Sequence, residues 1–97
     1  MNRLYKSYAT MAVYKILILP SVIKKDLAKV SNKDLVRIMN RIQTLADNLR
    51  PQWSKKLSGR EEYRARQGSY RILYVIDDGI RIVQITKIGH RKTVYKD

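Results

Sequence analysis

The 97-residue sequence contains no cysteine and only one histidine, His90. The lack of cysteine excludes disulfides, thiolate-bound zinc and a cysteine nucleophile, and it fits a reducing cytoplasm, where we expect the protein to be located. A single histidine excludes a metal site built from several histidines, and we expect neither a metal nor a small-molecule cofactor. No apolar run is long enough to span a membrane, and residues 12–22 are interrupted by Lys15 and Pro20, unlike the core of a signal peptide.

Acidic residues are also few, because 8 Asp and Glu stand against 21 Lys and Arg, giving a net charge of +13. Such an excess repels itself and is typical of proteins that bind a polyanion. Nucleic acid is the first candidate partner, followed by an anionic membrane or an acidic protein. The length predicts one domain, assigned to residues 13–97, and we expect residues 1–12 to be a flexible extension, with Met1 or Met11 as the true start.

The hydrophobic pattern predicts an α+β fold, with a helical hairpin on one face of a small antiparallel sheet. Residues 13–19 are expected to form a strand, and Ile23, Leu27 and Val30 mark one face of a first helix. Ser31 is the expected N-cap of a second helix that ends at Arg50. The remaining segments are expected to be a loop over residues 51–62 and strands over residues 63–67, 70–77, 80–88 and 90–95.

Two short turns predict how the later strands pair. Gly68-Ser69 fits a type II′ turn, which places Arg66 directly opposite Arg71 and Arg64 on the same face. Asp78-Gly79 fits a type I′ turn, which would pair residue 76 with 81 and residue 72 with 85. Val83 and Ile85 would then face the core, whereas Gln84 and Thr86 would face the arginines.

The three arginines on one sheet face form a candidate phosphate-binding site. Like charges directly opposite each other destabilise a sheet, so their presence needs a reason. A guanidinium matches the oxygens of a phosphate, which favours a functional interpretation. In the alternative interpretation, the guanidiniums spread into solvent or are neutralised by Glu61 or Glu62.

Other basic residues give weaker signals. Lys55, Lys56 and Arg60 lie in the predicted loop and are candidate RNA-binding residues. The helical stripe of Lys33, Arg37 and Arg41 is expected to be a solvated face. Gly89 suggests a bend that redirects the chain end, and Tyr95 is either a packing residue or a stacking platform for a base.

The segment Tyr63-Arg-Ala-Arg-Gln-Gly-Ser-Tyr-Arg-Ile-Leu-Tyr74, followed by Ile85-Thr-Lys-Ile-Gly-His-Arg-Lys-Thr-Val-Tyr95, resembles the RelE-like branch of the RelE/ParE toxin superfamily. The resemblance covers residues 13–95. It implies the toxin of a type II toxin–antitoxin pair, with an acidic antitoxin, the ribosome and mRNA as partners. RelE-like members cut mRNA in the ribosomal A site without a metal, because the RNA 2′-OH attacks the adjacent phosphate and leaves a 2′,3′-cyclic phosphate.

By this resemblance, the functional residues are Arg64, Arg66, Arg71, Arg91 and Tyr95. Arginine stays protonated, so Arg64 and Arg66, where some members have lysines, are poor general bases. Residues 51–54 also lack the glutamate that other members use. The general base therefore stays open between His90 and Tyr95, and histidine is the side chain that ordinarily titrates near neutral pH.

Two other functions are compatible with the sequence. A ParE-like toxin would poison DNA gyrase without nuclease activity, and ParE-like proteins commonly lack the basic ending with its tyrosine. A nonenzymatic RNA-binding module would need stacking aromatics on the sheet, for which Tyr95 is the one good candidate. Arg91 and Tyr95 together favour the nuclease.

Overall fold

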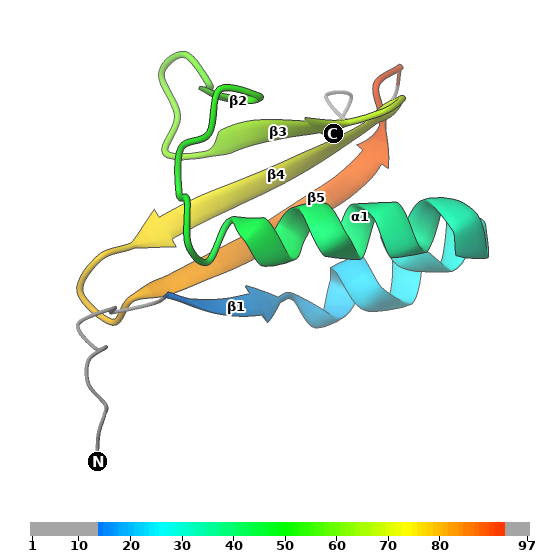
Figure 1. The fold of residues 1–97 in the computed structure, drawn as a ribbon, viewed down its shortest axis with the longest axis horizontal. Coiled ribbons are helices and arrows are strands. Elements are labelled where there is room, and N and C mark those ends of the chain that lie inside the picture. Colours follow the sequence, from blue (N-terminus) through cyan, green and yellow to red (C-terminus); the bar gives the residue numbers. More distant parts are fainter. Residues whose placement is uncertain (1–13, 93–97) are drawn as a thin grey trace.

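A computed structural model describes residues 14–92, which form an α+β fold, as predicted (Figure 1). Its elements are β1 (Lys15–Ile18), η1 (Val22–Asp26), η2 (Leu27–Lys29), α1 (Asn32–Thr44), β2 (Ser54–Lys56), β3 (Tyr63–Gln67), β4 (Tyr70–Asp77) and β5 (Ile82–His90). The expected N-terminal extension and the part of the expected last strand after residue 92 lie outside the described residues.

The first arm of the helical hairpin is irregular, because η1 is a π-helix and η2 a 3₁₀-helix. The N–H of Leu27 donates to the carbonyl of Val22, which is the wider turn of a π-helix. This turn places Val22, only 1% exposed, in the core, while Ile23 is 53% exposed. The prediction that Ile23 belongs to the apolar face was therefore wrong.

Helix α1 begins as predicted, with the Ser31 hydroxyl accepting the Asp34 N–H at 3.3 Å. It ends at Thr44, earlier than the predicted Arg50. Asp47 and Asn48, both poor helix formers, follow the helix, and the Tyr74 hydroxyl donates to the Leu49 carbonyl at 2.8 Å. Residues 45–50, predicted as the last helical turns, therefore form a turn instead, and Leu49 still packs against the core.

The five strands form one mixed sheet in the order β1-β5-β4-β3-β2, in which β1 pairs with β5 in parallel and the other pairs are antiparallel. The predicted loop over residues 51–62 contains the short edge strand β2, which the sequence pattern did not indicate. Helices η1, η2 and α1 all lie on one side of the sheet (Figure 1). The core fills that interface with Ile38 and Ile42 from α1 and with Ala65, Ile72, Tyr74, Val83, Ile85 and Ile88 from the sheet.

The hairpin between β4 and β5 differs from the predicted two-residue turn. Asp77 pairs with Ile82, and Ile76 pairs with Val83, so residues 78–81 form a longer loop. The Asp77 carboxylate stabilises this loop by accepting the N–H groups of Gly79 at 3.0 Å and Ile80 at 3.3 Å. Val83 and Ile85 are nevertheless fully buried, as predicted, because the shift of two residues keeps each side chain on its face.

Candidate functional site

The face of the sheet that points away from α1, here called the outer face, holds the predicted arginines. Ala65 and Ile72 point toward α1 and are 0% exposed, so the residues that alternate with them point outward. The β3–β4 register confirms that Arg66 lies directly opposite Arg71. Gly68 in the connecting turn has φ +58°, a left-handed conformation that glycine adopts without a steric cost.

Strand β2 adds a lysine to this face. Its register places Lys55 directly opposite Arg64, and Arg64 is in turn opposite Leu73 of β4. Lys56 pairs with Tyr63 and therefore belongs to the helix side of the sheet. The loop prediction was thus wrong about the conformation of this segment, although it named Lys55 as a candidate contact.

A β-bulge adds a second lysine. Tyr74 pairs with Ile85, but Leu73 pairs with Lys87, so Thr86 is the extra residue on β5. The bulge turns Lys87 to the outer face and Ile88, 2% exposed, into the core. The predicted pairing of residue 72 with 85 was wrong, since Ile72 pairs with Ile88. We define the basic cluster as Lys55, Arg64, Arg66, Arg71 and Lys87.

The two opposed arginines differ in their contacts. Nη1 of Arg71 donates to the carbonyls of Gly68 at 3.2 Å and Tyr70 at 3.0 Å, which orients this guanidinium beside the β3–β4 turn. Gly89, opposite Arg71, has no side chain to cover it. Arg66 is exposed, and its guanidinium makes no hydrogen bond or ion pair with another residue in 14–92.

Glu62, which precedes β3, contacts Arg60 and Thr86. Its carboxylate forms an ion pair with Arg60 at 2.6 Å and accepts the Thr86 hydroxyl at 3.4 Å. Arg60 is therefore held by a carboxylate at the predicted RNA-binding loop. Of the three residues predicted there, Lys55 alone joins the basic cluster among the described residues.

At the end of β5, the candidate residues Arg91 and His90 lie on different sides of the sheet. The Arg91 N–H donates to the Ser69 carbonyl at 2.8 Å, which anchors Arg91 beside the β3–β4 turn and thus near Arg71. His90 pairs with Tyr70 on the helix side, where the two rings meet edge to face at 6.0 Å. Because β5 continues through Gly89 in regular pairing with Arg71, the predicted bend at that glycine is not present. Tyr95 lies outside the described residues.

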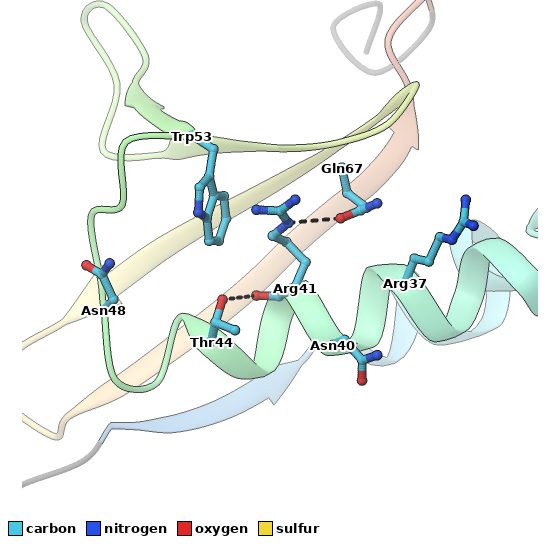
Figure 2. Close-up of a pocket in the computed structure, with 7 residues that line it drawn as sticks. All are labelled: Arg37, Asn40, Arg41, Thr44, Asn48, Trp53 and Gln67. Carbon is cyan, nitrogen blue, oxygen red and sulfur yellow. Dashed lines mark hydrogen bonds between the residues drawn. The ribbon is translucent and has the colours of Figure 1, made fainter.

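A second basic site, here called the edge groove, lies between α1 and the edge of β3 (Figure 2). Its volume is about 500 Å³, and it is lined by Arg37, Asn40, Arg41, Thr44, Asn48, Trp53 and Gln67. The guanidinium of Arg41 lies over the Trp53 ring at 4.3 Å, and its Nε donates to Gln67 at 2.9 Å. The sequence predicts that Arg41 belongs to a solvated helical face, but in the structure its side chain is held by Trp53 and Gln67.

Within residues 14–92, no group of three or more His, Cys, Asp or Glu side chains is placed to hold a metal ion. No helix in the same part of the chain is both long and apolar enough to cross a membrane. The described outer face offers the cations of the basic cluster, gathered on one side of the sheet. Such a surface can hold a phosphodiester and stabilise negative charge that develops on it.

The family described as ParE toxin of the type II toxin–antitoxin system parDE matches residues 18–95. The chain belongs to this toxin family. A protein of Methanocaldococcus jannaschii named "Putative toxin RelE1" is 36% identical to the toxin over 77 residues, which is 75% of this chain and 86% of the relative. The toxin is thus a RelE-like member of the type II class.

Solved structures of RelE proteins share the fold. The toxin–antitoxin complex RelBE2 of Mycobacterium tuberculosis matches with a TM-score of 0.72 and 27% identity, covering 81% of this toxin and 99% of that chain. The archaeal RelE–RelB complex of Pyrococcus horikoshii matches with a TM-score of 0.73 and 25% identity, covering 84% of this toxin and 99% of that chain. Both similarities extend over nearly the whole described domain.

Proposed function

We propose that the toxin is a ribosome-dependent endoribonuclease that cleaves mRNA in the ribosomal A site and so inhibits translation. The observation that carries the proposal is the pair of Arg66 and Arg71, directly opposite each other on a sheet face that no described helix covers. Retaining two like charges in direct opposition costs stability, and a phosphate bound between them would remove that cost. Membership of the RelE-like family supports the same reaction.

In this reaction the RNA supplies its own nucleophile. The 2′-oxygen loses its proton and forms a bond to the adjacent phosphorus, and the bond from phosphorus to the 5′-oxygen breaks. The leaving 5′-oxygen takes up a proton from solvent, so a 2′,3′-cyclic phosphate and a 5′-hydroxyl remain. Arg71, oriented by the turn carbonyls, and Arg91, anchored to Ser69, would stabilise the charge that accumulates on the phosphate oxygens. Arg64, Lys55 and Lys87 would hold the flanking phosphates.

The proton of the 2′-OH must pass to a group other than an arginine. We assign the transfer of this proton to Tyr95, which is a functional residue by the family resemblance and whose phenol can relay a proton by releasing its own. His90 lies on the opposite face, and its Nδ1 accepts the Lys92 N–H at 3.2 Å. We therefore assign His90 a positioning role, in which it fixes the turn that follows β5 and contains Arg91.

Single-turnover cleavage of mRNA on purified ribosomes tests the assignment. Removing a donor that contacts the transition-state oxyanion costs about 100- to 1000-fold in rate, so Arg71→Ala and Arg91→Ala should each slow cleavage by that factor. Lys24→Ala, which removes an exposed cation from η1 on the helix side, should stay within about 2-fold. Wild-type rates for both arginine variants, with unchanged melting temperatures, would refute the proposed site.

The proposed partner that restrains the toxin is an acidic antitoxin, in the cytoplasm where ribosomes are found. The net charge of +13 favours an acidic protein, and the solved relatives are complexes of RelE with RelB. Expression with the neighbouring gene of the native operon should yield a complex that resists moderate salt. Isolation of the uncomplexed toxin from such cells, without growth arrest, would argue against this partner.

A second candidate function is gyrase poisoning, because the matching family is named for ParE. Primer extension on a translated mRNA separates the two functions. Cuts within codons that require ribosomes support the nuclease, whereas DNA damage that depends on gyrase, without such cuts, supports the ParE-like activity.

A further inference from the structure

We propose that the edge groove is a second RNA-binding subsite, which takes the phosphate backbone of the strand as it leaves the basic cluster. The inference rests on the proposed function, since it extends the path of the same RNA. The edge groove would contribute to the affinity for RNA without contacting the phosphate that is cleaved. The residues that define it are Arg41, Trp53 and Gln67.

Arg41 is pre-organised for a phosphate. Its guanidinium is fixed by the Trp53 ring on one side and by the bond from Nε to Gln67, so few side-chain conformations have to be lost on binding. Among residues 14–92, the terminal nitrogens of Arg41 make no hydrogen bond or ion pair. The charged fork that remains has the geometry that matches two phosphate oxygens. Arg37, one helical turn earlier, lines the same groove.

The groove is continuous with the basic cluster. A second depression, lined by Arg41, Gln52, Trp53, Arg66 and Gly68, shares Arg41 and Trp53 with the edge groove and reaches Arg66. It lies just before the start of β2, because Trp53 precedes that strand and its carbonyl accepts the Arg66 N–H at 3.1 Å. A single strand can therefore pass from Arg66 around the sheet edge to Arg41 without crossing an acidic lining residue.

The chemistry of the lining favours RNA over an acidic protein segment. Apart from Trp53, the groove is lined by amides, a hydroxyl and guanidiniums and by no carboxylate, which suits a chain that carries a phosphate at every nucleotide. A phosphodiester chain places one negative charge at each nucleotide and can satisfy Arg66, Arg41 and Arg37 in succession. The planar guanidinium of Arg41, held over Trp53, also offers a flat surface of the kind on which bases stack.

The test compares two arginines that are held in the same way. Arg50 lies over the Tyr63 ring at 5.4 Å and donates from Nε to the Tyr63 hydroxyl at 2.9 Å, but it does not line either depression. Arg41→Gln and Arg50→Gln therefore remove the same charge and the same kinds of contact. The probe is a labelled 2′-O-methyl RNA of about 10 nucleotides, which lacks the nucleophile and falls within the site sizes of single-strand binders.

Anisotropy titrations should show that Arg41→Gln weakens RNA binding about 10-fold and makes the salt slope shallower by about 0.7, the loss of one phosphate contact. Arg50→Gln should stay within about 2-fold. In the wild type, RNA should change the fluorescence of Trp53, which is the one tryptophan of the chain. Equal losses in the two variants, or unchanged Trp53 emission at saturating RNA, would overturn the inference.

The cleavage assay separates this inference from the proposed function. Arg41→Gln should raise the toxin concentration needed for half-maximal cleavage on ribosomes but keep the maximal single-turnover rate, whereas Arg71→Ala should lower the maximal rate. A loss of maximal rate in Arg41→Gln would place Arg41 in the catalytic site and overturn the subsite. A weaker antitoxin complex with unchanged RNA affinity would show that the groove binds protein. Melting temperatures serve as the folding control.

Discussion

Arg66→Gln should make the toxin more stable and less active. Arg66 is exposed, directly opposite Arg71, and its guanidinium makes no hydrogen bond or ion pair with another residue in 14–92. Arg71, in contrast, donates to two turn carbonyls, so its removal would also lose contacts. Replacing Arg66 by glutamine therefore relieves the repulsion while keeping the polar, extended side chain.

The size of the gain follows from the register. Directly opposed residues interact by about 0.2–1 kcal/mol, and like charges in that geometry are destabilising. For a domain of this length, 1 kcal/mol corresponds to about 4–8 °C, so the melting temperature should rise by about 1–8 °C at low salt. Because the Debye length falls from about 10 Å at 0.1 M to about 3 Å at 1 M salt, most of the gain should disappear at the higher concentration.

Thermal unfolding followed by circular dichroism measures this gain. Lys56→Gln is the matched control, because Lys56 is an exposed cation on a neighbouring strand that pairs with Tyr63 rather than with another cation. It should change the melting temperature by less than Arg66→Gln does. In the same preparation, Arg66→Gln should slow A-site cleavage at least about 10-fold if it contacts the phosphate. A destabilised Arg66→Gln, or a gain that survives 1 M salt, would refute the argument from opposed charges.

Three further outcomes are expected. Tyr74→Phe removes the hydroxyl that donates to Leu49 and should cost about 1–3 kcal/mol in urea unfolding at neutral pH. Burial raises the pKa of Tyr74 above its ordinary value of 10.0, so the folded state holds the hydroxyl proton more firmly than the unfolded state does. The stabilisation by this hydroxyl is therefore complete below pH 10.0 and is lost as the pH rises through the folded-state pKa. The difference in unfolding free energy between the wild type and Tyr74→Phe should accordingly narrow at alkaline pH. Deleting Thr86 should remove the β-bulge but keep every other side chain on its face, so the free energy of unfolding should fall by less than about 1.5 kcal/mol. Deleting Gln84 would instead turn Ile85 out of the core and lower the free energy of unfolding by about 2–5 kcal/mol in the same assay. Binding of single-stranded RNA should fall with salt with a log–log slope of about −3.5 to −6, as expected if 5–8 phosphates are neutralised, and a slope near zero would exclude the basic surfaces as the contact.

The features that the sequence predicted correctly depend on neighbours in the chain. Ser31 caps α1 through a residue three positions away, and the turn at Gly68-Ser69 places Arg66 opposite Arg71 by its length alone. The arginine cluster followed from that turn and from the two-residue alternation of a strand. The turn sequence and the alternation of strand residues were therefore sufficient to predict the pair of Arg66 and Arg71 at the centre of the candidate site.

The features that it missed depend on tertiary contacts. The segment Ser54–Lys56 has two lysines and no apolar residue, so its strand conformation results from pairing with β3 rather than from its own propensity. Arg41 resembles any solvated helix residue until the chain turns back and places Trp53 beneath it. A helical charge stripe cannot reveal such a contact, because the partner lies on another element.

The β-bulge is an intermediate case, since its trace is present in the sequence. Val83 and Ile85 are two residues apart, but the next core residue, Ile88, follows after three. A regular strand would turn Lys87 into the core and Ile88 outward, at the cost of burying a charge and exposing an isoleucine. One extra residue at Thr86 avoids both costs and adds a cation to the outer face. The same irregularity that satisfies the hydrophobic core therefore extends the basic cluster, which is why a strict two-residue alternation left Lys87 out of the candidate site.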